Sequence, residues 1–196
     1  MEKVLVVEDE KNIRDLIKFN LENAGYEVFT AADGSKAMDQ LSEEIELVVL
    51  DLMLPEIDGM EVCRRMRGSE ELRQIPIIML TAKGEEVERI LGLEMGADDY
   101  MTKPFSPREL VARAKAIFRR IKKFKAENEK LKDEIIEAGK LKLDIPRHEV
   151  VYGEEKIVLT PKEFELLRYL VINQGRVLSR DLLLEKIWGY EYAGDT

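Results

Sequence analysis

The sequence predicts an α/β protein whose first 121 residues form a flavodoxin-like, doubly wound domain around a five-stranded parallel sheet. Fully apolar runs recur in this part, each followed by loop residues: Val4–Val7, Leu47–Leu50 and Ile77–Leu80. Amphipathic stretches with helical spacing separate the runs, which indicates right-handed βαβ units. From residue 140 apolar and polar residues alternate instead, and this predicts a second, smaller α+β unit.

The three apolar runs are the inner strands of the predicted sheet, because a parallel strand is covered on both faces and carries few polar residues. Two weaker strands are expected at Glu27–Thr30 and Asp98–Met101. Five strands that alternate with helices match a doubly wound domain.

The predicted helices carry apolar residues three or four positions apart, so that one face of each packs on the sheet. These residues fall in five stretches: Ile13–Ala24, Ala37–Leu41, Met60–Met66, Val87–Glu94 and Leu110–Phe118. Gly25 follows the first stretch as a helix stop.

Residues 122–139 are rich in Lys, Glu and Ala and predict a helical linker that continues the helix from residue 106. A thin apolar stripe runs along it from Phe118 to Ala138. We favour a solvated linker helix; a short coiled-coil contact is the alternative, with fewer than three heptads to support it.

Residues 140–196 predict short strands followed by two helices. Leu141, Leu143 and Ile145 alternate with polar residues, and further strands are expected at 150–152 and 157–159. Thr160, Pro161 and Glu163 form the pattern of a capping box, so a helix begins there and runs to Gly175. A second helix is expected from Arg180, capped by Ser179.

Composition narrows the possible functions. The 196 residues include 31 basic and 40 acidic ones, for a net charge of −9, which argues against a generally basic nucleic-acid binder. The apolar runs are too short for a membrane span, and the N-terminus lacks a secretory signal, so we expect a cytoplasmic protein without membrane contact. Cys63 is the single cysteine and is expected in the core, whereas His148, the single histidine, is expected at a surface turn.

Chemically active side chains follow the ends of four predicted strands. Glu8 and Asp9 follow the first strand, and Asp51 ends the third. Thr81 and Lys103 follow the fourth and fifth. In a doubly wound sheet these carboxyl ends line the ligand-binding edge, so we expect the side chains to converge there.

Clustered carboxylates favour a cation, and hard oxygen ligands suit Mg²⁺. No Gly-rich phosphate loop is present, which disfavours nucleotide binding. A carboxylate can instead attack a phosphoryl group and form an aspartyl phosphate. Mg²⁺, Lys103 and the Thr81 hydroxyl would each cover one phosphoryl oxygen.

The first 121 residues resemble the receiver domains of two-component response regulators. The matching motifs are VLVVEDE at 4–10, VVLDLMLPEIDG at 48–59, IIMLTAK at 77–83 and GADDYMTKPFSPREL at 96–110. The resemblance implies a signalling phosphoacceptor with only weak intrinsic phosphotransfer and self-dephosphorylation, rather than an enzyme.

The resemblance assigns roles residue by residue. It makes Asp51 the phosphoacceptor, Thr81 and Lys103 the phosphoryl-binding residues, and Tyr100 a switch residue whose rotamer follows Thr81. The implied Mg²⁺ ligands are Glu8, Asp9, Asp51 and the backbone carbonyl of Met53. Glu8 stands where many receivers have Asp, which implies a metal contact through water. The Lys103–Pro104 bond is expected to be cis, as in the family.

Residues 140–196 resemble the start of the winged-helix DNA-binding domain of the OmpR/PhoB branch, through LKLD at 141–144, the segment 150–170 and GRVLSRDLLLEKIWG at 175–189. In that family a recognition helix and a wing follow, and those read DNA. The chain ends at Tyr192–Thr196, so we expect no DNA-recognition residue in it and promoter binding by the full-length protein only.

The family resemblance further implies two protein partners: a cognate sensor histidine kinase and, after phosphorylation, a second copy of the chain. The expected dimer face spans residues 84–120. It contains Arg89, Ile90, Leu93, Glu94, Asp98, Asp99, Glu109, Ala112, Arg113, Lys115 and Arg120. We expect three pairs across the two-fold interface: Arg89 with Glu109, Asp99 with Arg113, and Asp98 with Arg120.

Two other functions fit the sequence less well. A stand-alone receiver would act only through protein contacts, which leaves residues 140–196 unexplained as the native role. A phosphatase of the haloacid dehalogenase kind needs a second acid two residues after the nucleophile, and Met53 occupies that position.

Overall fold

The computed structural model describes residues 1–82, 96–130 and 135–187. The chain divides into two compact units, Met1–Lys123 and Phe124–Thr196. Among the described residues, none of the helices combines the length and apolar character that crossing a membrane requires.

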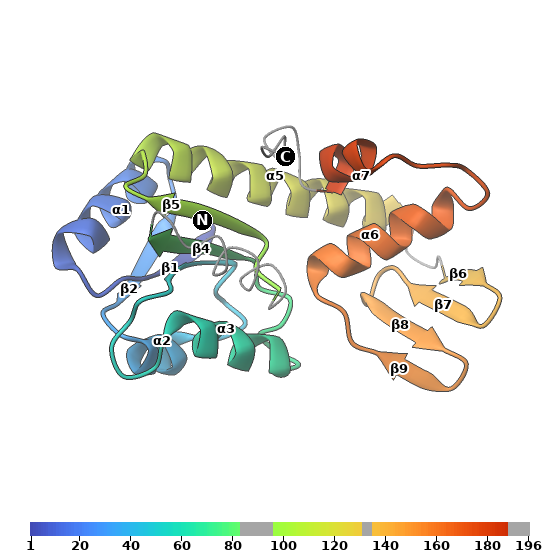
Figure 1. Cartoon of the computed structure of the whole chain (residues 1–196), viewed down its shortest axis with the longest axis horizontal. Coiled ribbons are helices and arrows are strands. Elements are labelled where there is room, and N and C mark those ends of the chain that lie inside the picture. Colours follow the sequence, from blue (N-terminus) through green and yellow to red (C-terminus); the bar gives the residue numbers. More distant parts are fainter. Residues whose placement is uncertain (83–95, 131–134, 188–196) are drawn as a thin grey trace. The chain divides into compact units, whose positions relative to one another are not determined.

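The first unit contains a parallel sheet in the order β2-β1-β3-β4-β5 (Figure 1). Its strands are β1 (Lys3–Val7), β2 (Glu27–Ala31), β3 (Leu47–Asp51), β4 (Ile77–Ala82) and β5 (Asp99–Lys103). This confirms the predicted doubly wound fold, because the strand order reverses beside β1 and the carboxyl ends of β1, β3, β4 and β5 meet at one edge.

Helices cover both faces of this sheet. Figure 1 shows α1 (Lys11–Asn23) and α5 (Pro107–Lys130) on one side, and α2 (Gly34–Gln40) and α3 (Gly59–Gly68) on the other. The helix predicted at Val87–Glu94 lies outside the described residues.

Each face of the sheet has its own core, because successive strand residues point to opposite faces. Leu5 and Val7 of β1 pack with residues of α2 and α3, whereas Val4 and Val6 pack with residues of α1 and α5. The inner strands are therefore buried on both sides, as predicted. Cys63 is fully buried in the α2–α3 layer, which confirms its place in the core.

The second unit pairs four antiparallel strands in the order β6-β7-β8-β9 with two helices. The elements are β6 (Ile135–Ala138), β7 (Leu141–Asp144), β8 (Glu149–Tyr152), β9 (Glu155–Ile157), α6 (Pro161–Ile172) and α7 (Arg180–Ile187). Leu143, Ile145, Val150 and Phe164 form its buried core.

The capping box at the start of α6 is present. The Glu163 amide donates to the Thr160 hydroxyl at 3.4 Å, and the Thr160 amide donates to the Glu163 carboxylate at 2.8 Å. Ser179 accepts a hydrogen bond from the Leu182 amide and so caps α7, also as predicted.

The linker helix predicted over residues 122–139 is wrong at its C-terminal end. Helix α5 extends to Lys130, but Ile135–Ala138 forms β6 and pairs with β7. Gly139, with a φ of +64°, lies in the two-residue turn between these strands, where glycine has no steric penalty. In this hairpin Ile136 lies opposite Leu143, so strand pairing outweighs the helical propensity of the segment.

His148 is only partly at the surface, contrary to the prediction. It lies in the turn between β7 and β8, half-buried, with its ring centroid 4.9 Å from that of Phe164. The turn was predicted correctly, but the left-handed backbone at His148, with a φ of 54°, accompanies a ring placed against the core.

Candidate functional site

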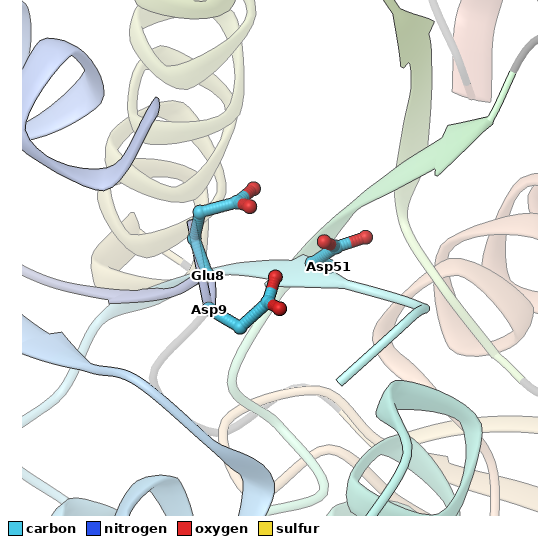
Figure 2. A group of neighbouring side chains, drawn as sticks. All are labelled: Glu8, Asp9 and Asp51. Atoms are coloured by element: carbon cyan, nitrogen blue, oxygen red, sulfur yellow. The ribbon is translucent and has the colours of Figure 1, made fainter. Parts of the chain in front are cut away.

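Three carboxylates gather at the carboxyl edge of the parallel sheet. Glu8 and Asp9 follow β1 in succession, and Asp51 is the last residue of β3, which pairs with β1. One carboxylate oxygen of each lies within 4.8 Å of those of the other two. Figure 2 shows the three side chains around one shared space. Because β1 and β3 are parallel neighbours, the fold brings together acids that are more than forty residues apart in sequence.

The ammonium of Lys103, at the end of β5, joins two of these acids. Its Nζ lies 2.7 Å from an oxygen of Glu8 and 2.7 Å from an oxygen of Asp51. The predicted convergence of strand ends is thus realised for Glu8, Asp9, Asp51 and Lys103. The Lys103–Pro104 bond that follows is cis, as expected.

Burial differs among the acids. Glu8 has no exposed surface and Asp51 is 3% exposed, whereas Asp9 is exposed. Burial raises the pKa of Glu8, the hydrogen bond from Lys103 opposes this, and the nearby Asp51 charge raises the pKa further. Burial alone would lower the Lys103 pKa, but the hydrogen bonds to Asp51 and Glu8 outweigh it and raise the pKa.

The donor set fits a magnesium ion. Among the described side chains that contact these carboxylates, Lys103 is the one cation, so negative charge remains in excess when all three acids are ionised. Closely spaced carboxylate oxygens, one of them exposed to water, suit a small hard ion that keeps part of its hydration shell.

The loop after Asp51 is held tightly. The Met53 amide donates to Asp51 Oδ1 at 3.2 Å, and the Gly59 amide donates to the Leu52 carbonyl at 2.9 Å. A Cβ atom on Gly59 would lie 2.0 Å from the Asp51 carbonyl oxygen, so only glycine permits this approach of α3 to the end of β3. Met53 itself is 65% exposed beside the acidic cluster.

Thr81 and Tyr100 lie on neighbouring strands. Thr81 is buried near the end of β4, where it pairs with Thr102, and Tyr100 of β5 packs against the α2–α3 core. Thr81 shares its sheet face with Met79, two residues earlier, and Met79 belongs to the same core as Tyr100. Both residues assigned to a switch therefore face the same layer.

The expected dimer face is partly described. Glu109, Ala112 and Lys115 are exposed on α5. Arg113 bonds within its own chain, 3.0 Å from both Asp99 oxygens and 2.8 Å from Glu109. Four residues of this face lie outside the described ranges: Arg89, Ile90, Leu93 and Glu94.

The prediction that Asp98 lies on the dimer face and pairs with Arg120 of a second copy is wrong, because Asp98 is buried. It is 5% exposed, and its carboxylate accepts hydrogen bonds from Arg67 at 3.0 Å and from the Ile77 amide at 2.9 Å. Arg120 acts on it electrostatically within the same chain. Sequence spacing did not indicate that Arg67 of α3 would pair with Asp98 in the interior of the unit.

Sequence reasoning also missed Arg14, which lies one turn into α1. Its Nη1 donates to the backbone carbonyls of Glu8 at 2.6 Å and Asp9 at 3.0 Å. A basic residue five positions after an acidic pair was the available signal. The segment Tyr192–Thr196, on which the expectation about DNA recognition depended, lies outside the described residues.

Comparison with known proteins agrees with this site. A family model described as a response regulator receiver domain matches residues 4–115, and one described as the C-terminal domain of transcriptional regulatory proteins matches residues 153–196.

Two relatives and one solved structure extend these matches. The chain is 52% identical over 198 residues to the alkaline phosphatase synthesis transcriptional regulatory protein PhoP of Bacillus subtilis, covering 99% of this chain and 82% of that protein. It is 49% identical over 190 residues to the probable transcriptional regulator ycf27 of Galdieria sulphuraria, covering 96% and 73%. The structure of Thermotoga maritima DrrB, an OmpR/PhoB homolog, is 35% identical and covers 96% of this chain and 80% of its own, with a TM-score of 0.57.

A receiver domain followed by a transcription-regulating domain defines a response regulator of a two-component system. The chain belongs to the OmpR/PhoB family of these proteins. A stand-alone receiver does not account for the match at residues 153–196.

Proposed function

We propose that Asp51 accepts a phosphoryl group from the phosphohistidine of a cognate sensor histidine kinase, and that phosphorylation promotes dimerisation of the chain. The observation that carries this proposal is the Lys103 ammonium, 2.7 Å from both Asp51 and Glu8, with Asp9 beside them. A carboxylate next to an ammonium and to further acids is suited to attack a phosphoryl group whose charge needs neutralising.

In the proposed transfer, an Asp51 oxygen forms a bond to phosphorus while the bond from phosphorus to the donor imidazole nitrogen breaks. The electron pair of the broken bond stays on that nitrogen, which takes a proton from water, and the product is an acyl phosphate. Lys103 then holds one phosphoryl oxygen, and the Thr81 hydroxyl donates a hydrogen bond to another.

Glu8, Asp9, Asp51 and the Met53 carbonyl would hold Mg²⁺. The ion would neutralise charge that develops on the phosphoryl oxygens during transfer. Glu8 is buried and tied to Lys103, so its side chain also fixes the position of the ammonium.

We propose a receiver at residues 1–121 and a DNA-binding domain that includes residues 140–196. Strand β6 (Ile135–Ala138) belongs with this domain through its pairing with β7, so the linker expected at 122–139 ends before Ile135. Promoter DNA is the proposed target of the domain to which residues 140–196 belong. The match to a transcription-regulating domain at residues 153–196 supports this assignment.

Labelling with acetyl phosphate and Mg²⁺ tests the phosphoacceptor. We expect one phosphoryl group per chain in the wild type, none in Asp51→Asn, and an unchanged level in Asp39→Asn, which alters an exposed acid on α2. Removing Mg²⁺ with EDTA should abolish labelling. Intact-mass spectrometry reads the result; labelling of Asp51→Asn at the wild-type level contradicts the proposal, and many turnovers per chain would favour a phosphatase.

We further propose that the switch couples Asp51 to the 84–120 face through Thr81 and Tyr100. A phosphoryl group on Asp51 would attract the Thr81 hydroxyl, and the space that Thr81 leaves would admit the Tyr100 ring. Their common sheet face supports this coupling.

Sedimentation of the chain treated with beryllofluoride and Mg²⁺ tests the dimer. Glu109→Arg should weaken association, and the double change Arg89→Glu/Glu109→Arg should restore it. Arg64→Glu, a charge reversal on α3 with the side chain 64% exposed, is the control expected to dimerise normally.

Loss of one surface ion pair costs only about 0–1 kcal/mol, but a charge reversal also places like charges opposite each other, so Glu109→Arg should weaken association by more than the loss of one pair. Thr81→Ala should accept a phosphoryl group and dimerise poorly. A wild type that stays monomeric, or a Glu109→Arg variant that dimerises fully, is incompatible with this face.

A further inference from the structure

We propose that Arg14 is a positioning residue that fixes the turn carrying Glu8 and Asp9 and thereby raises the Mg²⁺ affinity of the acidic cluster. This inference rests on the proposed magnesium site. Arg14 lies on α1 and would take part in metal binding, although among the described contacts its side chain touches none of the three carboxylates.

The contacts are specific. Arg14 Nη1 donates to the Glu8 carbonyl at 2.6 Å and to the Asp9 carbonyl at 3.0 Å. The Arg14 amide donates to the Glu10 carbonyl at 2.9 Å, in the first turn of α1. One half-buried residue therefore engages the carbonyls of all three residues in the turn between β1 and α1.

The rest of the turn is held less firmly. The Glu8 amide donates to the Ala31 carbonyl at 3.1 Å and continues the pairing with β2, and the Glu10 amide donates to the Glu8 carboxylate at 3.3 Å. Glu10, the N-cap residue of α1, makes no capping hydrogen bond through its side chain. Asp9, which lies between them, is exposed. The described hydrogen bond that holds its backbone is the one that its carbonyl accepts from the Arg14 guanidinium at 3.0 Å.

Fixing the turn sets the direction of both acidic side chains. Metal ligands that are held by a second layer of hydrogen bonds pay less entropy on binding, and loss of such a partner typically weakens metal affinity about 10–100-fold. The loss of the Arg14 hydrogen bonds should affect Asp9 most, because the Glu8 carboxylate is also held by Lys103.

The charge of Arg14 alone would change the Mg²⁺ affinity in the opposite direction. A guanidinium near a divalent cation repels it, so an Arg14 that acted only through its charge would weaken Mg²⁺ binding. Removing the charge would then tighten the metal site. The direction of the change in affinity therefore separates positioning from electrostatics.

The experiment measures metal affinity directly in the full 196-residue chain, without phosphorylation. Mn²⁺ binding is followed by electron paramagnetic resonance, and Mg²⁺ affinity by competition against it. We compare the wild type with Arg14→Met, which keeps the length and loses the donors, and with Arg14→Lys, which keeps the charge. Lys18→Met removes a cation from the same helix, where it pairs with Glu22 at 3.7 Å, and is the matched control.

We expect Arg14→Met to bind Mg²⁺ about 10-fold more weakly or worse, Arg14→Lys to lie between it and the wild type, and Lys18→Met to match the wild type. Thermal unfolding in EDTA checks that Arg14→Met is folded; if it is not, Arg14→Lys decides the matter by binding Mg²⁺ more weakly than the wild type does. Equal or tighter binding in the folded Arg14 variants overturns the inference.

A failure of the proposed magnesium site would give a different result from a failure of the role of Arg14. In that case the wild type itself would bind no metal, or Asp51→Ala would bind as tightly as the wild type. Metal binding that depends on Asp51 but is unchanged in folded Arg14→Met would leave the proposed function standing and reject the role of Arg14 alone.

Discussion

His148 is held against Phe164 by a turn whose backbone adopts a left-handed conformation at the histidine, with a φ of 54°. Burial lowers the pKa of its imidazole, the Arg168 charge lowers it further, and a hydrogen bond with the backbone at Pro146 opposes both effects. The imidazole in the folded unit therefore resists protonation.

The titration of His148 can be measured without ambiguity, because it is the one histidine of the chain. We expect its midpoint, followed by the imidazole proton signals in NMR, to lie below the ordinary value of about 6.5. The unfolded chain takes up the proton first as the pH falls through that value, so the second unit should lose stability there. His148→Asn tolerates the positive φ and should remove this slope. A midpoint at or above the ordinary value contradicts the prediction.

At the residue scale, the sequence predicted the acidic cluster because its members end parallel strands. Glu8, Asp51 and Lys103 each follow an apolar or β-branched run, so topology alone sets them side by side. Asp98 and Arg14 follow no such rule. Asp98 pairs with Arg67 because of how α3 packs on the sheet, and Arg14 binds backbone carbonyls because of how the turn before α1 is folded. The residue spacing within one segment predicts neither contact.

At the scale of elements, Arg67 near the end of α3 connects three segments of the first unit. Its guanidinium donates to the carbonyls of Gly96, Arg73 and Ile75 at 2.8–2.9 Å and to the Asp98 carboxylate at 3.0 Å. The side chains of Arg67 and Asp98 are 9% and 5% exposed. This ion pair ties the entry of β5 to the loop that leads into β4.

Arg67→Met should destabilise the first unit by about 3–5 kcal/mol, because it leaves the Asp98 carboxylate buried without its cation. Adding Asp98→Asn should recover part of the loss, since an amide oxygen still accepts from Ile77 and no charge remains. Arg65→Met, on the same helix but paired with Glu61 at the surface, should cost no more than about 1 kcal/mol. Urea unfolding measures all three; equal effects of Arg67→Met and Arg65→Met would refute the assignment.

The missed strand β6 shows where element prediction from sequence ends. Ile135 and Ile136 sit at the end of a Lys- and Glu-rich stretch that favours a helix locally. The strand forms because Ile136 pairs with Leu143 across a tight turn at Gly139. This stabilising contact depends on a residue outside the Lys- and Glu-rich stretch, so local propensity does not predict it. The capping box of α6, by contrast, is complete within four residues and was predicted correctly.

At the scale of the whole molecule, the two units have separate cores. The first buries apolar side chains on both faces of its parallel sheet, and the second buries Leu143, Ile145, Val150 and Phe164 between its antiparallel sheet and α6. The acidic cluster lies entirely within the first unit, so a ligand bound there acts directly on one core only.

Calorimetry should therefore show two unfolding transitions, of which beryllofluoride with Mg²⁺ raises only one. Ligand at 100-fold excess over its dissociation constant stabilises the folded state by about 2.7 kcal/mol. For a unit of this size, that raises the midpoint by roughly 10 °C. Asp51→Asn should lose the shift while the other transition stays where it is in the wild type. A single transition would mean that the units unfold as one, and two transitions that rise together with ligand would mean that the site stabilises both cores.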